Sequence, residues 1–194
     1  MTPFDVVALV FLVGWFIVGY VQGIVRRVFG IIALVFALLV AAQLRQPLGD
    51  YLAQQWTNAP AEYSDMVAFG ALFLAMWIAL SVGIQLAYRP APLLPRYPAV
   101  DEVLGGVLGL LEAALLLIVL LLVTDPYFAS TAGQSAAAGE FAPVRTLHDL
   151  LNSSLTADYL RHHVIPGIVG LFGFLFPSDV VQTFRSALAA WRLA

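Results

Sequence analysis

The sequence VDEVLGGVLGLLE (residues 100–112) continues without a further charge to Thr124, and this stretch decides the class of the protein. A helix needs about 20 mainly apolar residues to cross the roughly 30 Å hydrocarbon layer of a bilayer. The stretch begins with two carboxylates, which favour the positive end of a helix dipole. It carries Gly105 and Gly109 four residues apart and places Glu112 where lipid is expected. We therefore predict a membrane-spanning helix with a small-residue packing face and a buried acid.

Composition extends this conclusion to the whole chain. Of 194 residues, 61% are hydrophobic and 11% are charged, and the mean hydropathy is +0.91. Soluble domains have about 45–50% apolar and about 25% charged residues, so lipid must solvate much of this chain. The net charge of −3 gives no reason to expect a nucleic-acid partner. The absence of cysteine excludes disulfides, thiolate nucleophiles and cysteine metal sites.

The apolar stretches predict an all-α membrane protein with four transmembrane helices. Residues 4–44 would make a helix of about 60 Å, about twice the hydrocarbon thickness. We therefore predict two spans, at about 4–22 and 26–45, with a reversal between them. One long kinked helix is the alternative. The third and fourth spans are expected at about 65–88 and 102–124, and the four together form a domain over residues 1–125.

The reversal is expected within residues 19–27. Glycine loosens the backbone there, and Arg26 and Arg27 are expected to reach the membrane interface. Further along, Pro47 and Gly49 are expected to end the second helix.

The chain changes character after the fourth span, which we expect to end at Asp125-Pro126. Residues 126–194 are predicted to form a flexible Ala/Ser/Gly-rich linker and a tail of short amphipathic or interfacial helices. The tail is expected to lie on the membrane surface, on a partner or on its own bundle.

Arginine counts near the spans predict the orientation. The reversal carries Arg26 and Arg27, and a proline-rich connection carries Arg89 and Arg96, whereas the short loops on the opposite side carry Arg45 alone. The positive-inside rule then places both arginine-bearing connections in the cytoplasm. The N-terminus and the tail are accordingly expected outside.

Glu112 is the main candidate for a functional role within the spans. A charge near the bilayer centre costs about 2.5–3.5 kcal/mol on insertion scales, so the carboxyl should face protein or water, or be protonated. One interpretation is a proton or cation relay. The other is a protonated carboxyl bound to Gln22, Gln43 or Gln85, or one that lies near the interface.

Glycine spacing predicts where helices approach closely. Gly19 and Gly23 repeat the four-residue spacing of Gly105 and Gly109. Such pairs favour close contact, either within one bundle or between two copies of the chain.

Signatures of enzyme chemistry are missing from the sequence. His162-His163 lies one turn after Asp158, a spacing that a metal can use, but no third ligand is near in sequence, and a solvated tail helix is the other reading. No nucleophile elbow, Walker loop, GxGxxG or zinc signature occurs. We therefore expect no enzyme, no metal and no cofactor.

Three motifs follow one another along the first 125 residues: an acid before the first span, a Gly-x-x-x-Gly-x-x-Arg reversal, and an Asp-x-x-Leu-Gly-x-x-x-Gly element. Their residues are Asp5; Gly19, Gly23 and Arg26; and Asp101, Leu104, Gly105 and Gly109. In order and spacing, over roughly residues 4–125, the chain resembles the CvpA (colicin V production protein) family. It departs from the family pattern at Arg27, where Glu is frequent, and at Glu112-Ala113, where Arg-Gly is frequent.

The resemblance implies a bacterial inner-membrane protein needed for production or export of a peptide toxin, or for envelope function, and it brings no established catalytic residue. Three functions stay open: a non-enzymatic membrane scaffold or assembly factor, a small oligomeric transporter or channel that uses Glu112, and a membrane anchor for a partner protein. The expected partners are the lipid bilayer and either a second copy or an envelope protein. The candidate functional or packing residues are Asp5, Gly19, Gly23, Arg26, Asp101, Gly105, Gly109 and Glu112.

Overall fold

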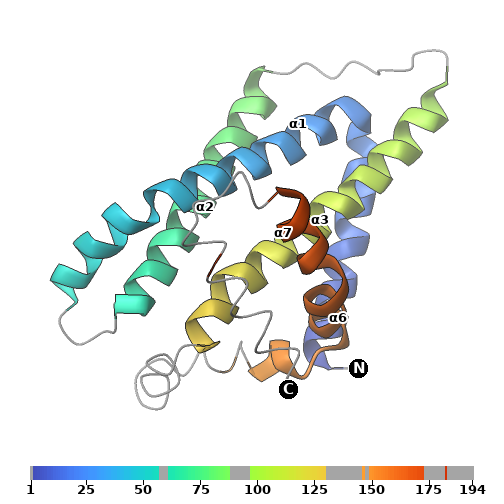
Figure 1. Cartoon of the computed structure of the whole chain (residues 1–194). Coiled ribbons are helices and arrows are strands. Elements are labelled where there is room, and N and C mark those ends of the chain that lie inside the picture. Colours follow the sequence, from blue (N-terminus) through green and yellow to red (C-terminus); the bar gives the residue numbers. More distant parts are fainter. Residues whose placement is uncertain are drawn as a thin grey trace.

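The computed structural model describes residues 2–56, 61–87, 97–129 and 149–172, together with residues 146 and 182. Its elements are α1 (Pro3–Gln55), α2 (Ala61–Ala87), α3 (Pro98–Ala129), α6 (Leu155–Tyr159), the π-helical η1 (Leu160–Val164) and α7 (Ile165–Phe172) (Figure 1). Within these ranges there is no strand, which agrees with the all-α prediction. Among the described residues, three helices are long and apolar enough to cross a membrane: α1, α2 from Ser64, and α3 as far as Asp125.

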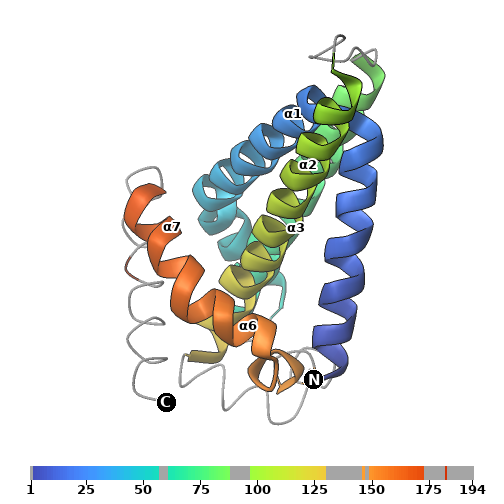
Figure 2. The same ribbon diagram turned by 90° about the vertical axis from the view of Figure 1, so that its right-hand side faces the viewer.

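α1 consists of two helical arms that meet at Gly23. This residue has φ 75° and ψ 177°, a backbone conformation that glycine adopts far more readily than other residues. Figure 2 shows the first arm (3–22) leaving the N-terminus and the second arm (24–55) turning back alongside α3. The chain therefore turns inside the stretch in which the sequence predicts the reversal.

Two expected helix ends are wrong. The second arm continues through Pro47 and Gly49 to Gln55, and α3 continues past Asp125-Pro126 to Ala129. A proline inside a helix costs about 3 kcal/mol because it removes a backbone hydrogen bond. In the second arm, packing against α2 offsets the free energy that Pro47 costs the helix. Gly49 is buried there and lies directly against the side chain of Asp65 in α2.

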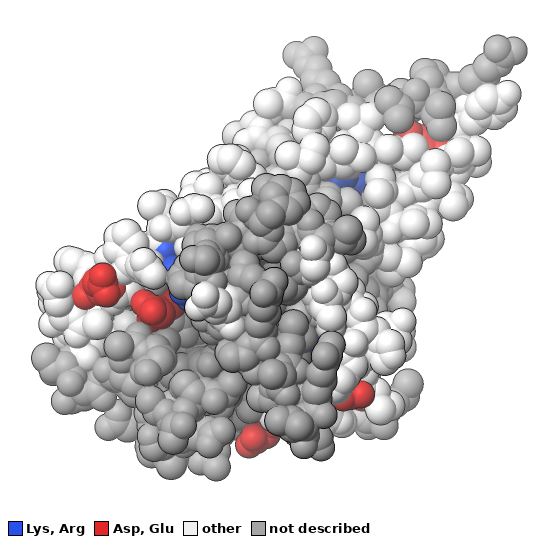
Figure 3. Space-filling view, in the orientation of Figure 1, with Lys and Arg blue, Asp and Glu red and all other residues white. Residues whose placement is uncertain are grey.

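α1 holds the bundle together, because both α2 and α3 pack mainly against it and only slightly against each other. The core includes Leu34 and Ala37 of α1, Phe69 of α2 and Leu121 of α3. Elsewhere large apolar side chains face outward, such as Val21, which is 78% exposed. On the face in Figure 3 the charged side chains lie mostly towards the ends of the helices. This distribution is typical of a protein whose solvent is lipid.

The short helices of residues 155–172 pack back onto the bundle (Figures 1 and 2). Leu151, Leu160 and Ile165 are buried in the same core as side chains of α1, α2 and α3. The π-helical turn has a local cause, since Pro166 has no N–H to donate and its ring needs a wider preceding turn. Ile165 N–H accordingly donates to Leu160 O, five residues back. The predicted linker after Ala129 lies outside the described residues, and of the tail after residue 172 only Gln182 is described.

Candidate functional site

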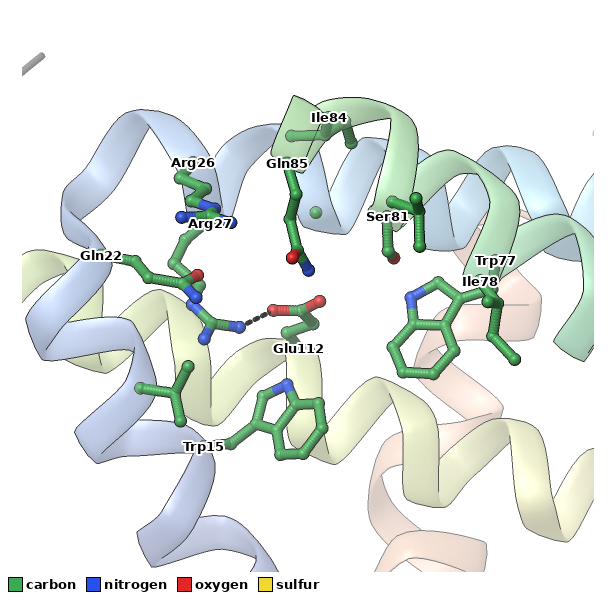
Figure 4. A pocket seen from close by; sticks show the side chains of 13 residues that line it. Trp15, Gln22, Arg26, Arg27, Trp77, Ile78, Ser81, Ile84, Gln85 and Glu112 are labelled. Carbon is green, nitrogen blue, oxygen red and sulfur yellow. Dashed lines mark hydrogen bonds and ion pairs between the residues drawn. The ribbon is translucent and has the colours of Figure 1, made fainter. Parts of the chain in front are cut away.

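Glu112 forms a buried ion pair with Arg27 of the second arm (Figure 4). Their side chains are only 5% and 6% exposed, respectively. Arg27 is therefore buried in the bundle and paired with Glu112, and does not extend away from the protein. Sequence reasoning paired Glu112 with glutamines and missed Arg27, although a charge in a membrane span normally has a partner of opposite sign. The feature of the sequence that could have identified this partner is Arg27 itself, which follows Gly23 by four residues.

The ion pair joins two positions at which the sequence departs from the pattern that the resemblance implies. The resemblance places Glu at position 27 and Arg at position 112, whereas this chain has Arg27 and Glu112. The structure brings these two positions into contact across the α1–α3 interface.

Gly30 makes room for the carboxylate of Glu112. A Cβ atom at this position would lie 3.0 Å from Glu112 Oε1, closer than side chains normally tolerate. Gly30 therefore lets the second arm approach the acid closely enough for Arg27 to pair with it.

A pocket of about 340 Å³ lies beside the ion pair, between α1 and the last turns of α2. Besides Arg27 and Glu112, its polar lining consists of Trp15, Gln22, Arg26, Trp77, Ser81 and Gln85 (Figure 4). We call this space the polar pocket. The candidate residue Arg26 and two of the three glutamines considered as partners of Glu112 thus gather here, whereas Gln43 is exposed elsewhere on the second arm.

The lining of the polar pocket contains buried hydrogen-bond donors that lack an acceptor. Trp15 Nε1, Trp77 Nε1 and Arg27 Nε have no hydrogen-bond partner within the part of the chain that the structure describes. Figure 4 shows the nitrogen edges of both indoles turned towards the pocket and Glu112. Such groups are rare in native proteins and call for an explanation.

The four candidate glycines meet where α1 crosses α3. A Cβ on Gly109 would lie 3.2 Å from Gly19 Cα, and one on Gly105 would lie 2.8 Å from Gly23 Cα. Only glycine permits the two backbones to approach so closely. These contacts are made within one chain. Asp101 is buried at the same crossing, with its carboxylate directly against Gly23.

Asp5 is the centre of a second polar cluster, at the N-terminal end of α1. Its Oδ2 accepts hydrogen bonds from Thr2 N at 2.8 Å and from Thr2 Oγ1 at 3.0 Å. Asp5 N in turn donates to Thr2 Oγ1 at 3.3 Å, which completes a capping box. Its Oδ1 accepts from Ser154 Oγ at 2.6 Å and from Thr156 N and Oγ1, both at 3.0 Å. Ser154 also accepts from Ala157 N and so caps α6. One buried carboxylate therefore joins the start of α1 to the start of α6.

A second buried ion pair joins the end of α3 to η1. Arg161 donates from Nε to Asp125 Oδ2 at 2.9 Å and from Nη2 to Asp125 Oδ1 at 2.7 Å. This two-point geometry is the strongest that arginine and a carboxylate form. Asp125, expected merely to end a helix, instead anchors the segment 149–172.

The histidines considered as metal ligands do not gather with other ligands. His162 Nδ1 lies 3.1 Å from Asp158 Oδ1, in an exposed pair one helical turn apart. Across the described ranges, no group of three or more His, Cys, Asp or Glu side chains is placed to hold a metal ion.

Comparison with known proteins gives one match. The model of a family described as "Colicin V production protein" matches residues 4–164. The match runs from the Asp5 cluster through the Arg27–Glu112 pair to the end of η1. No curated protein and no solved structure matches the chain.

Proposed function

We propose, from the premise that this chain belongs to the colicin V production protein family, that it serves production or export of a colicin V-like peptide toxin as a non-enzymatic membrane scaffold or assembly factor. Its place would be the bacterial inner membrane. As an assembly factor it would work with a second copy of itself or with an envelope protein.

The lengths of the helices support a proposal of four membrane crossings. One uninterrupted helix as long as α1, with its 53 residues, would measure about 80 Å, far more than a bilayer accommodates. The first arm alone measures about 30 Å, which matches the hydrocarbon layer. With α2 and α3, the two arms then make four crossings. The arginines after Gly23 favour a cytoplasmic reversal, with the N-terminus and the segment 149–172 outside.

The observation that carries the scaffold proposal is how the buried acids are used. Asp5, Glu112 and Asp125 each bind a side chain from a distant element, and together they join α1, α3 and the segment 149–172. Acids that are paired in this way hold helices together, which supports a structural role. A proton relay would instead need an acid that exchanges protons with its surroundings. No catalytic residue is needed for this role.

Toxin secretion tests the proposal. In a colicin V-producing strain that lacks its own family member, the chain should restore secretion of active toxin. The double variant Arg27→Glu with Glu112→Arg keeps the buried pair and should also restore secretion. Ser154→Ala removes one hydrogen bond that docks the tail and should lower secretion, whereas Ser153→Ala, at an exposed neighbour, should not. Full secretion by the Ser154 variant, with none by the exchanged pair, would contradict the scaffold.

A small oligomeric transporter is the second candidate, favoured by the polar pocket of about 340 Å³ beside Glu112. Its test is proton flux in proteoliposomes, with the parent compared with Glu112→Gln. Flux in the parent that is lost in the variant would support the transporter. The scaffold predicts no flux in either.

A further inference from the structure

The polar pocket has an excess of positive charge and of hydrogen-bond donors. Among the described residues, its charged lining consists of Arg26, Arg27 and Glu112, so one positive charge exceeds the ion pair. The two indole N–H groups and Arg27 Nε add donors for which the described residues supply no acceptor. Arg27 itself is only 5% exposed. A pocket built in this way fits an anion with several acceptor oxygens.

The size of the polar pocket suits a small chemical group. Its volume of about 340 Å³ is at the lower end of the range for ligand pockets, about 300–1,000 Å³. One water molecule occupies about 30 Å³ in the liquid, so a single water is far too small to fill this space.

The rest of the lining indicates what the anion is attached to. Val18, Ile78 and Val82 also line the pocket and are 41%, 53% and 47% exposed, on the apolar outer surface of α1 and α2. Gln85 lies in the last turn of α2, and Arg26 lies just after the reversal, so the polar end of the pocket lies near the ends of the helices. The pocket therefore combines polar side chains with apolar residues that lie on the outer surface of α1 and α2.

We propose that the polar pocket binds the phosphodiester of an anionic phospholipid head group. Arg26 would supply the charge that Glu112 does not neutralise, and the indole N–H groups of Trp15 and Trp77 would donate to phosphate oxygens. Arginine suits this role because its planar fork matches phosphate geometry. The acyl chains would lie along Val18 and Ile78. This site goes beyond the scaffold function and does not depend on it.

Tryptophan fluorescence of the full chain in detergent tests this site. The chain has four tryptophans, so the background Trp56→Phe with Trp191→Phe leaves Trp15 and Trp77 of the pocket as reporters. The probes are dioctanoyl phosphatidylglycerol, dioctanoyl phosphatidylcholine and inorganic phosphate. We expect a saturable change with phosphatidylglycerol, binding at least about tenfold weaker with phosphatidylcholine, and no saturation with inorganic phosphate.

Two variants of opposite effect make the test specific. Arg26→Gln should weaken phosphatidylglycerol binding by about tenfold, whereas Arg45→Gln, on the same helix outside the pocket lining, should leave it unchanged. Glu112→Gln should strengthen binding, because it releases Arg27 from its carboxylate. If that variant does not fold, Arg26→Gln and the ligand-induced rise in melting temperature still decide the outcome.

Three results would overturn the proposal. Equal affinity for the two lipids would show that the pocket does not select an anionic head group. Unchanged affinity in Arg26→Gln would place the binding elsewhere. Inorganic phosphate that binds as tightly as phosphatidylglycerol would identify a site for the free anion instead of a lipid.

Discussion

At the scale of single residues, Arg27 and Glu112 show both the cost of burying an ion pair and the attraction that offsets this cost. Removing both charges from a polar environment is costly, and their attraction repays this only while both partners are present. The pair is therefore weak evidence for net stability. We expect its main effect on register, because it joins one face of α3 to the second arm. Gly30 contributes to the same register by leaving space for the carboxylate.

Exchange of the two charges is the sharpest test at this scale. Arg27→Glu alone places two carboxylates together, and Glu112→Arg alone places two guanidinium groups together. Each should lower stability by about 3–5 kcal/mol, because a buried charge is left uncompensated. The double variant should recover most of that loss. Thermal melting in detergent gives the comparison, with Asp50→Asn, at an exposed position, as the control. A double variant as unstable as the sum of the singles would show that the pair does not set this contact.

The contact between α1 and α3 is decided at the scale of whole elements by four glycines. Gly19 and Gly23 allow the first arm and the kink to approach Gly105 and Gly109 until the two backbones are in contact. Lipid tails are as apolar as leucine, so van der Waals packing of this kind must supply much of the helix association. The segment 149–172 is attached differently, by the Asp5 cluster and the Arg161–Asp125 pair, and these polar contacts gain strength from burial.

Gly109→Leu should separate α1 from α3, because a Cβ atom there already lies 3.2 Å from Gly19 Cα. Overpacking in a tight core costs about 1–3 kcal/mol, and more where backbone must move. We expect a lower yield of folded protein and a lower melting temperature in detergent. Gly83→Leu in α2 is the matched control, since nothing lies within 4 Å of a Cβ at that position. Equal melting of the two variants would contradict this account of the crossing.

The arrangement of crossings belongs to the whole molecule. The reversal at Gly23 brings the second arm back alongside α3, and the segment 149–172 begins at the same end of the bundle as the N-terminus (Figure 2). Four crossings would place both ends of α1 on one side of the membrane. A single crossing by α1 would place them on opposite sides.

Cysteine labelling separates these arrangements, because the chain has no cysteine of its own. Pro3, Gln54 and Tyr97 are all exposed and suit single substitutions to Cys. In intact cells, a membrane-impermeant maleimide should label Pro3→Cys and Gln54→Cys from the same side and should leave Tyr97→Cys unlabelled until the cells are opened. Labelling of Pro3→Cys and Gln54→Cys from opposite sides would show that α1 crosses once.

Hydropathy and local backbone preference determined much of the fold from the sequence alone. Mean hydropathy of +0.91 requires lipid as solvent, and an apolar run twice as long as the bilayer is thick requires a turn, which glycine at position 23 supplies. The family motifs and the Gly-x-x-x-Gly spacing are equally local in the sequence. Such signals can be read without knowing the neighbours of each residue.

Tertiary structure alone decided the partners of the buried charges and where the helices end. Arg27 and Glu112 are 85 residues apart, Asp5 and Ser154 are 149 apart, and Asp125 and Arg161 are 36 apart, so no local pattern links them. Pro47 stays inside a helix for the same reason, since packing between α1 and α2 outweighs a local preference of about 3 kcal/mol. The polar pocket also exists only in the folded bundle, because its lining comes from three separate helices that the α1 reversal brings together.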